Sequence, residues 1–357
     1  MPPARTGVAD YTAALVEALR PLASVEVNPD RPTGVTLCHV GNNPLHAEAY
    51  RRAVERPGAV ILHDAVLHHF LLGWLDESAY VEEFVFNYGE WNRELAGELW
   101  RGRARSAGDA AFFQHGMLRR LAETARVVIV HNIAAEEKVR SEAPCARIEV
   151  VPHLALPPAE PPAGFEVLRV RERFGPGALV FGLFGHLRES KRVMTVLSVF
   201  RRVRRRHANA WLVVAGGFVS PDLERAAAPL LSETGVVRLP YLDERDFWLW
   251  AHAVDVCVNL RYPAAGETSG ITVRMMGIGR AVMVTAGGET AEFPSGSCLP
   301  VDPGLAEEEM VEAFMEWLCH EPDRARELGF HARNHILRAH DPAAVARKIA
   351  GICARLA

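Results

Sequence analysis

The chain alternates short apolar runs with longer segments of helical periodicity along nearly its whole length. Short runs rich in Val, Ile and Leu are typical of strands that are buried on both faces of a parallel sheet. They fall at residues 36–40, 59–62, 127–130 and 148–151, and again at 180–184, 210–214, 236–239, 255–260 and 281–284. Segments of helical spacing separate them, for example 11–20, 193–207 and 307–320. This alternation predicts an α/β fold of parallel sheets with helices on both faces.

A proline-rich connector separates the two sets of strands. Residues 152–164 contain five prolines, which favour a semi-rigid, non-helical linker. A length of 357 residues also exceeds that of one typical domain. We therefore predict two Rossmann-like, doubly wound parallel-sheet domains at residues 1–155 and 156–357. The segment ending at Gly7 opens directly into a helix, so we expect the N-terminal domain to lack its first strand.

The composition argues against a nucleic-acid-binding, disulfide-rich or membrane-spanning protein. A net charge of −4 gives no reason to expect a nucleic-acid partner. The six cysteines include no C-x-x-C pair, which indicates a reducing compartment. No apolar run approaches the roughly 18 residues of a membrane span, and no signal peptide is evident. We therefore expect a cytoplasmic protein.

The segment 262–279 combines an acidic turn with the start of a helix. Glu267 stands at the turn, and Thr268, Ser269 and Gly270 follow it. The first backbone N–H groups of a helix are free and form a natural seat for a phosphate or pyrophosphate. A carboxylate beside them could bind sugar hydroxyls. The turn follows a predicted strand, at the end where open α/β sheets bind ligands.

A basic loop follows the predicted strand 180–184. His186, Arg188, Lys191 and Arg192 concentrate donors and positive charge there, as a diphosphate requires. The alternative is an ordinary solvated basic turn.

Histidine at another strand end suggests contact with a sugar. His63 follows the apolar run 59–62, and as a neutral imidazole it could donate to a sugar hydroxyl or a leaving oxygen. Asp64, His68 and His69 nearby raise the possibility of a metal site. Their spacing is not that of a known ligand set, so we expect no metal and assign His68 and His69 to packing or the surface.

Two further strand ends carry polar or flexible residues. Asn42 and Asn43 could form a turn or could read acceptor hydroxyls. Gly216 and Gly217 follow the predicted strand 210–214 and could let a nucleotide approach the backbone closely.

Two segments have both a structural and a functional interpretation. Residues 76–126 are rich in aromatics at helical spacing, which favours packing of helices on the sheet over an acceptor-binding cap. Residues 201–206 form an arginine run on an amphipathic helix, which favours a solvated helix face over a membrane or nucleic-acid surface.

Together these segments resemble the retaining glycosyltransferases of family 4, which have the GT-B fold. The loop G-H-L-R-E-S-K-R resembles that family's V-G-R-x-x-x-x-K-G loop, so Lys191 matches the lysine that holds the donor diphosphate. His186 replaces an arginine of the family. Glu267-Thr-Ser-Gly270 resembles the E-G-F-G turn, whose glutamate binds sugar hydroxyls. Arg274 replaces the glutamate that binds the ribose, and this departure suggests a phosphate contact or a different nucleotide.

The resemblance extends to other parts of the chain. Gly7 resembles the glycine near the donor phosphates, and His63 resembles the histidine that approaches the donor sugar. Tyr241 lies in the segment that resembles the family's base-reading backbone. A C-terminal helix near 343–356 is expected to cross back toward the first domain.

The resemblance implies transfer of a sugar from a nucleoside-diphosphate sugar to an acceptor hydroxyl, with no metal and no bound cofactor. Catalysis would rest on Glu267, His63 and Lys191, and the acceptor would be a glycan, a lipid or a small molecule. A lipid acceptor would bring peripheral contact with the inner face of a membrane.

Other functions remain open. A sugar-nucleotide epimerase or phosphorylase would use the same fold, as would a non-catalytic binding protein. A Rossmann oxidoreductase is disfavoured, since no G-x-G-x-x-G follows a first strand.

Overall fold

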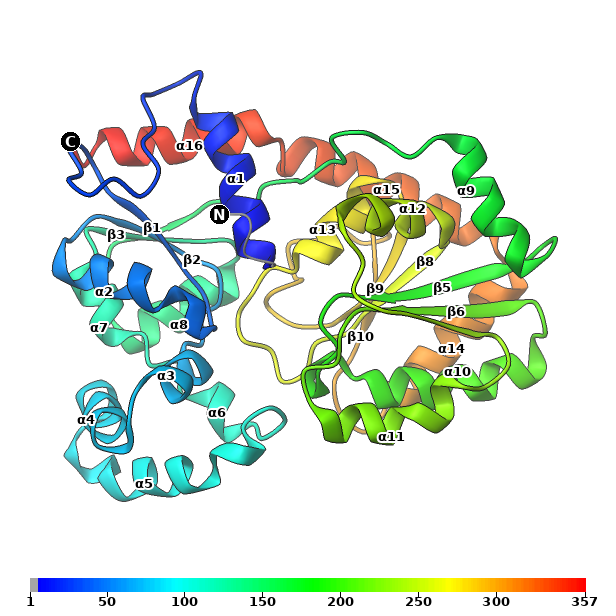
Figure 1. Cartoon of the computed structure of the whole chain (residues 1–357), viewed down its shortest axis with the longest axis horizontal. Helices are drawn as coiled ribbons and strands as arrows, with labels where there is room; N and C mark the ends of the chain where they lie inside the picture. Colours follow the sequence, from blue (N-terminus) through cyan, green and yellow to red (C-terminus); the bar gives the residue numbers. More distant parts are fainter. Residues whose placement is uncertain (1–5) are drawn as a thin grey trace. The chain divides into compact units, whose positions relative to one another are not determined.

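The computed structural model describes residues 6–357, which divide into two compact α/β units (Figure 1). The first unit contains Met1–Leu154, Pro263–Thr268 and His340–Ala357, and the second contains Ala155–Tyr262 and Ser269–Ala339. A short loop and the C-terminal segment therefore belong to the first unit, although both lie far from it in sequence.

The first unit contains a four-stranded parallel sheet in the order β1-β2-β3-β4. Its strands are β1 (Leu37–Val40), β2 (Ala59–Leu62), β3 (Val127–Val130) and β4 (Ile148–Val150). Every residue of β2 and β3 is buried, which explains why both strands are continuous apolar runs. The four predicted strands of this half are confirmed.

Helices surround this sheet, and they include the last helix of the chain. The helices are α1 (Gly7–Leu19), α2 (Ala47–Glu55), α3 (His68–Trp74), α4 (Glu77–Tyr88), α5 (Arg93–Gly102), α6 (Ala111–Gln114), α7 (Arg119–Thr124), α8 (Ile133–Glu142) and α16 (Pro342–Ala354), with 3₁₀ turns at Pro44–His46, Glu90–Asn92 and Arg103–Arg105. The α1 helix packs against α16, so segments from both ends of the chain lie side by side (Figure 1).

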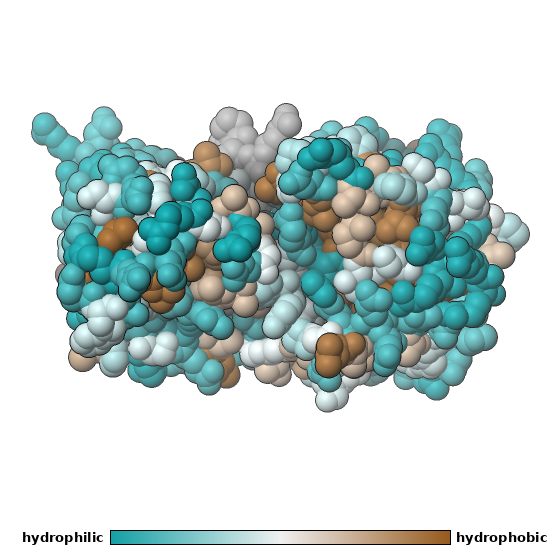
Figure 2. All heavy atoms as spheres, turned by 90° about the horizontal axis from the view of Figure 1, so that it is seen from below, coloured by the Kyte–Doolittle hydropathy of each residue, from teal (hydrophilic) through white to brown (hydrophobic). Residues whose placement is uncertain are grey.

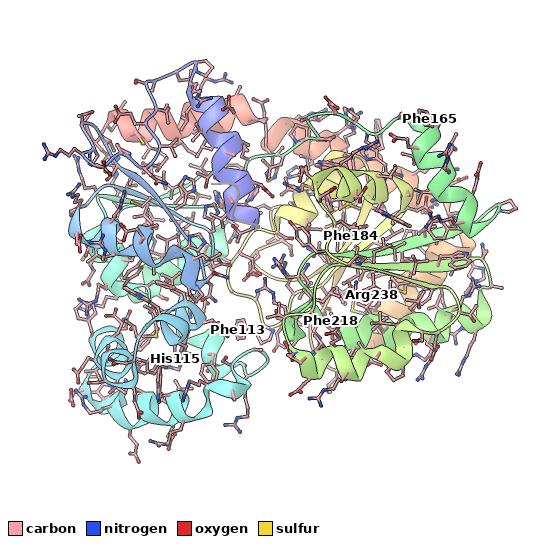
Figure 3. The ribbon with its side chains drawn as sticks, in the orientation of Figure 1. Phe113, His115, Phe165, Phe184, Phe218 and Arg238 are labelled. Atoms are coloured by element: carbon pink, nitrogen blue, oxygen red, sulfur yellow. The ribbon has the colours of Figure 1, made fainter. Side chains whose placement is uncertain are left out.

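The aromatic segment of the first unit forms much of its core. Tyr80, Phe84 and Phe112 are fully buried in the cluster that covers one face of the sheet. His115 packs edge-on against Tyr88 at 4.9 Å between ring centroids and lies within the same helical layer (Figure 3). Helix-to-sheet packing, the favoured interpretation of this segment, is what the structure shows.

The second unit contains a six-stranded parallel sheet in the order β10-β9-β8-β5-β6-β7. The strands are β5 (Leu179–Phe184), β6 (Ala210–Ala215), β7 (Val236–Leu239), β8 (Val256–Asn259), β9 (Ala281–Thr285) and β10 (Leu299–Val301). Five of them match the predicted runs. The sequence missed β10 because it is a three-residue edge strand with a proline at its centre.

Helices cover both faces of this sheet (Figure 1), and a hydrophobic cluster lies on each face. One cluster contains residues of α10 (Val193–Arg206), α11 (Pro221–Leu231) and α14 (Glu307–His320), and the other contains residues of α9 (Gly164–Arg171), α12 (Glu244–Ala253) and α13 (Gly270–Gly277). The helix α15 (Asp323–Ala339) contributes to both, and 3₁₀ turns lie at Glu172–Phe174 and Glu189–Lys191. The arginine run lies on α10, where Arg202 and Arg206 each form an ion pair with Glu312 of α14. These arginines thus belong to a solvated, paired helix face.

The surface has an ordinary mixed composition. On the face drawn in Figure 2, hydrophilic residues predominate and the hydrophobic residues form separate small patches. Among the helices of residues 6–357, none has both the length and the hydropathy that crossing a bilayer demands.

Candidate functional site

The basic loop of the second unit begins where β5 ends at Phe184. Lys191 is 4% exposed, and its ammonium donates a hydrogen bond to the carbonyl oxygen of Phe184. The amine is therefore held at the carboxyl end of β5 instead of extending into solvent. A cation fixed at a strand end is well placed to neutralise a phosphate.

The loops that follow β5 and β6 touch each other through a glycine. Gly216 has a φ of +142°, and a Cβ added there would lie 2.0 Å from the carbonyl oxygen of Gly185. By contrast, a Cβ added to Gly217 would meet nothing within 4 Å, so the backbone there borders open space. A ligand could approach that backbone closely.

Arg238 supports this pair of loops and was not among the residues predicted from the sequence. Its guanidinium donates to the carbonyl oxygen of Gly216 at 2.6 Å and lies over the ring of Phe218 at 5.2 Å (Figure 3). The arginine in the otherwise apolar run 236–239 was the available signal.

Two aromatic rings lie together at the ends of β5 and β7. His186 is exposed, and its ring centroid lies 6.4 Å from that of the half-exposed Tyr241, with 31° between the planes. Exposed flat rings at strand ends suit stacking with a planar group.

The acidic turn leads into α13, whose first turn is fixed by side chains from β8. Ser269 is the N-cap, and its hydroxyl accepts from the backbone N–H of Thr272 at 3.3 Å. Asn259 at the end of β8 donates to the hydroxyls of Ser269 and Thr272, each at 2.7 Å, and Arg261 donates to Ser269 at 3.1 Å. The N–H groups of the first turn thus have a rigid frame.

Two arginines that the sequence placed near the donor make contacts with other helices. Arg192 donates through Nε to Glu307, at 2.7 Å from Oε2, and that carboxylate is 1% exposed. Arg274 pairs with Glu244 at 3.1 Å and lies over the ring of Phe247 at 5.4 Å. Both side chains therefore have a role in helix packing.

Glu267 lies in the loop Pro263–Thr268, which belongs to the first unit. Its carboxylate accepts from the backbone N–H of Ala265 at 2.9 Å. Gly266 has a φ of +73°, and a Cβ added there would lie 2.6 Å from the Cβ of Ala65. Because Ala65 follows His63 by two residues, the acidic turn packs close to the end of β2.

Asn132 holds this turn, and the sequence analysis did not identify it. Its side chain is buried, and Nδ2 donates to the carbonyl oxygen of Gly266 at 3.1 Å and to Oγ1 of Thr268 at 2.9 Å. Its Oδ1 also caps α8 by accepting from the N–H of Ala135 at 2.8 Å. The signal was an asparagine between a predicted strand and a helical segment.

His63 belongs to a cluster of histidines at the carboxyl ends of the strands. Nε2 of His63 lies 3.0 Å from Nδ1 of His39. The ring centroid of His131 lies 5.3 Å from that of His63 and 5.2 Å from that of His153. Tyr11 of α1 fills the centre, with its ring centroid 4.9 Å from that of His63. Burial places the pKa of His63 well below its ordinary value, so the imidazole is neutral at pH 7.

The remaining predicted positions of the first unit have local partners or open space. Asn42 accepts at Oδ1 from the N–H of Phe70 at 2.8 Å, and Asn43 accepts from the N–H of Leu45 at 2.9 Å. These bonds favour the turn interpretation of both asparagines. Gly7 is the first residue of α1, where an added Cβ would meet nothing within 4 Å.

His68 has a packing role, and no metal site is evident around it. Nε2 of His68 lies 2.7 Å from the hydroxyl of Tyr80 inside the core. Across the described chain, residues 6–357, no group of three or more His, Cys, Asp or Glu side chains is arranged to hold a metal ion.

Comparison with solved structures identifies the architecture. No family model and no curated protein sequence matches the chain. A sucrose-phosphate synthase from Thermosynechococcus elongatus superposes with a TM-score of 0.63 at 15% identity, over 90% of this chain and 73% of that one. WaaG, a glycosyltransferase involved in lipopolysaccharide biosynthesis, gives 0.60 at 14% identity, over 97% of this chain and 95% of that one. The chain has the GT-B fold.

The GT-B fold confirms the predicted pair of parallel-sheet domains. Anabaena HepE, solved in complex with UDP and glucose, also superposes, with a TM-score of 0.60 at 12% identity over 89% of this chain and 98% of that one. Identities this low establish the fold alone, and the assignment to family 4 stays a prediction.

Proposed function

We propose that the chain transfers a sugar from a nucleoside-diphosphate sugar to an acceptor hydroxyl. The observation that carries the proposal is the buried Lys191, whose ammonium is held at the carboxyl end of β5. The loop follows β5, which is the first strand of the second unit. The similarity to HepE, which was solved with UDP and glucose, supports a nucleotide-sugar donor.

The second unit would bind the nucleotide part of the donor. Lys191 and the first N–H groups of α13 would stabilise the negative charge that grows on the departing diphosphate. The open backbone at Gly217 would let a phosphate or ribose approach, and the rings of His186 and Tyr241 would flank the base.

The first unit would bind the sugar. The carboxylate of Glu267 would accept hydrogen bonds from sugar hydroxyls, in a turn that Asn132 holds in place. His63 would donate as a neutral imidazole. In a retaining, metal-independent reaction the acceptor hydroxyl attacks from the face that the diphosphate leaves, and the departing phosphate oxygen takes its proton. No dyad of catalytic carboxylates is then needed, in contrast to glycoside hydrolysis.

Nucleotide binding tests the proposal directly. Thermal unfolding would be followed with UDP, GDP, ADP and dTDP and with their sugar conjugates, each with and without EDTA. A ligand at 100 times its Kd stabilises the folded state by roughly 2.7 kcal/mol, which is readily seen as a higher Tm. We expect nucleotides of one base to raise Tm most. EDTA should leave this rise in Tm unchanged, and Lys191→Met should abolish it.

The matched control is Lys348→Met, which removes an exposed lysine of α16. This variant should keep the full rise in Tm that the nucleotide causes in the unsubstituted chain. Retention of the shift in Lys191→Met would contradict the site assignment, and no shift with any nucleotide would contradict the donor class. A binding protein without catalysis would show the shift but no slow hydrolysis of the sugar nucleotide, which separates that alternative from an enzyme.

A further inference from the structure

The proposed donor site needs more positive charge than Lys191 supplies. The diphosphate of a sugar nucleotide carries two negative charges at neutral pH, and Lys191 contributes one cation at the end of β5. Arg192 forms an ion pair with Glu307. Arg274 forms an ion pair with Glu244, so both of these charges are already matched within the protein. A site that works without a metal therefore requires a second cation near Lys191.

Arg261 follows β8, the strand beside β5 in the sheet (Figure 1), and its backbone is fixed on both sides. The N–H of Arg261 donates to Oγ1 of Thr285 at the end of β9, at 2.9 Å. The N–H of Tyr262 donates to the carbonyl oxygen of Ser190 at 2.7 Å. The residue after Arg261 is thus bonded to the residue before Lys191, which brings the two loops together.

Both cations approach the first turn of α13. A Cβ added to Gly185 would lie 3.0 Å from Nζ of Lys191 and 3.8 Å from Cγ1 of Ile271, the second residue of that helix. Nη2 of Arg261 donates to the hydroxyl of Ser269, the N-cap of the same helix, at 3.1 Å. The amine and the guanidinium therefore lie near one helix N-terminus, where an anion is stabilised.

The thiol of Cys257, which is fully buried within β8, is influenced by both charges. Burial raises the pKa of Cys257 to about 12, and the positive charges of Lys191 and Arg261 each act in the opposite direction. Because such an effect weakens with distance, the two cations lie near the same strand.

The start of α13 is rich in hydrogen-bond donors. Nδ2 of Asn259, Nη2 of Arg261 and the N–H of Thr272 all point at the hydroxyl of Ser269, at 2.7, 3.1 and 3.3 Å. A hydroxyl oxygen has two lone pairs, so these donors exceed what it can accept. The guanidinium is also a planar fork that suits bidentate contact with phosphate oxygens. The environment thus favours an anionic acceptor of hydrogen bonds.

A ligand can reach Arg261 from solvent. Arg261, Ser269, Gly270 and Ile271 are all partly exposed, whereas Lys191 is 4% exposed. Lys191 is therefore the inner cation of this region and Arg261 is the outer one.

We propose that Arg261 is the second cation of the donor site and binds the β-phosphate of a nucleoside diphosphate, the phosphate that carries the sugar. Ser269, which accepts from the guanidinium, follows Glu267 by two residues. Because Glu267 is proposed to bind the sugar, the phosphate next to the sugar is the one expected at Arg261. This inference rests on the proposed function and assigns to it a further binding residue.

Calorimetry in the presence of EDTA tests the inference with the whole chain. The probes are UDP, GDP, ADP and dTDP, each compared with its monophosphate. Arg261→Met removes the guanidinium and keeps an unbranched side chain. We expect it to weaken the preferred nucleoside diphosphate roughly 10- to 100-fold, as for a lost hydrogen bond to a charged group. The monophosphate has no β-phosphate, so its affinity should change by less than about twofold.

Two further variants serve as controls. Arg261→Lys keeps the charge without the planar fork, so the diphosphate should bind more weakly than to the unsubstituted chain and more tightly than to Arg261→Met. This variant also allows the comparison to be made if Arg261→Met does not fold. Arg245→Met removes an exposed arginine of α12 that pairs with Glu166 at 2.8 Å, and it should leave both affinities unchanged.

The possible results separate this inference from the proposed function. Diphosphate binding that is lost in Lys191→Met but keeps its full advantage over the monophosphate in both Arg261 variants would overturn the role of Arg261 alone. An equal loss of both nucleotides in Arg261→Met, with a lower Tm of the free protein, would assign Arg261 to the fold and would also overturn it. No diphosphate binding by the unsubstituted chain would overturn the proposed function together with this inference.

Discussion

Asn132 shows how one buried amide can connect the cap of a helix to the turn that carries Glu267. Its oxygen caps α8, while its nitrogen donates to the backbone and side chain of the turn that carries Glu267. The turn is distant in sequence, since Gly266 lies 134 residues after Asn132. A side chain of this kind acts through another residue, so we regard Asn132 as a positioning residue for Glu267.

Substitution of Asn132 by Asp separates these two roles. A carboxylate keeps the cap on α8, but it replaces the donor facing Gly266 with a second acceptor. We expect turnover or donor hydrolysis to fall roughly 10- to 100-fold, because the carboxylate of Glu267, which we propose binds the sugar, loses its position. The affinity for the free nucleoside diphosphate, measured by calorimetry, should be unchanged. Full turnover in this variant would show that the turn does not need Asn132.

Glu267 itself should contribute to the reaction and not to the fold. Glu267→Gln keeps the shape and an acceptor for the N–H of Ala265, but it removes the negative charge. The charge-assisted hydrogen bonds to sugar hydroxyls would weaken, so we expect turnover to fall roughly 100-fold or more, with little change in Tm. A Tm lower by several degrees, together with normal turnover of the folded fraction, would assign Glu267 to structure instead.

At the scale of elements, the basic loop shows what a pattern of residues predicts and what it misses. The loop predicts correctly that Lys191 lies at the end of β5. It does not predict the partner of the Arg192 side chain. That partner is Glu307 at the start of α14, which lies 115 residues further along the chain. Long side chains reach partners that only tertiary packing brings near.

The Arg192–Glu307 pair should therefore stabilise the contact between α10 and α14. Arg192→Ala leaves the buried carboxylate of Glu307 without its counter-charge, and we expect a loss of about 2 kcal/mol in the free energy of unfolding, less than for a fully buried pair because the guanidinium is a third exposed. Adding Glu307→Gln should recover part of the loss. Denaturant unfolding of the two single variants and the double variant measures this coupling. Additive losses would mean that the pair contributes nothing.

The strands were predictable because a strand that is buried on both faces is a continuous run of apolar residues in the sequence. β2 and β3 read as unbroken apolar runs, whereas β10 is too short and too interrupted to give one. The candidate site could be proposed only where polar or charged residues stand in the segment after a strand, as His63 does after β2 and the basic loop does after β5. The local sequence around Asn132 and Arg238 marks each residue as unusual, but it does not identify their partners Gly266 and Gly216, which are distant in sequence.

At the scale of the whole molecule, the two units should differ in their response to acid. The first unit buries neutral histidines, and burial lowers the pKa of His39 to about 3, that of His131 to about 4, and that of His63 well below its ordinary value. In the unfolded chain each has a pKa near 6.5. Between these values the unfolded state binds more protons than the folded state, so stability is complete above about pH 6.5 and falls as the pH is lowered toward 3.

The expected slope is large because His39, His63 and His131 each gain a proton on unfolding, and His68, whose pKa burial also lowers to about 3, adds to the slope. Each histidine contributes up to about 1.4 kcal/mol per pH unit within this window, so three contribute up to roughly 4 kcal/mol per unit. Hydrogen exchange at pH 7.5 and 5.5 should therefore show the amides of β2 and β3 losing protection ahead of those of β5 and β6. His131→Gln should lower the slope by about 1.4 kcal/mol per unit, since one proton no longer takes part. Parallel loss of protection in both units would mean that acid lability arises elsewhere than in the histidine cluster.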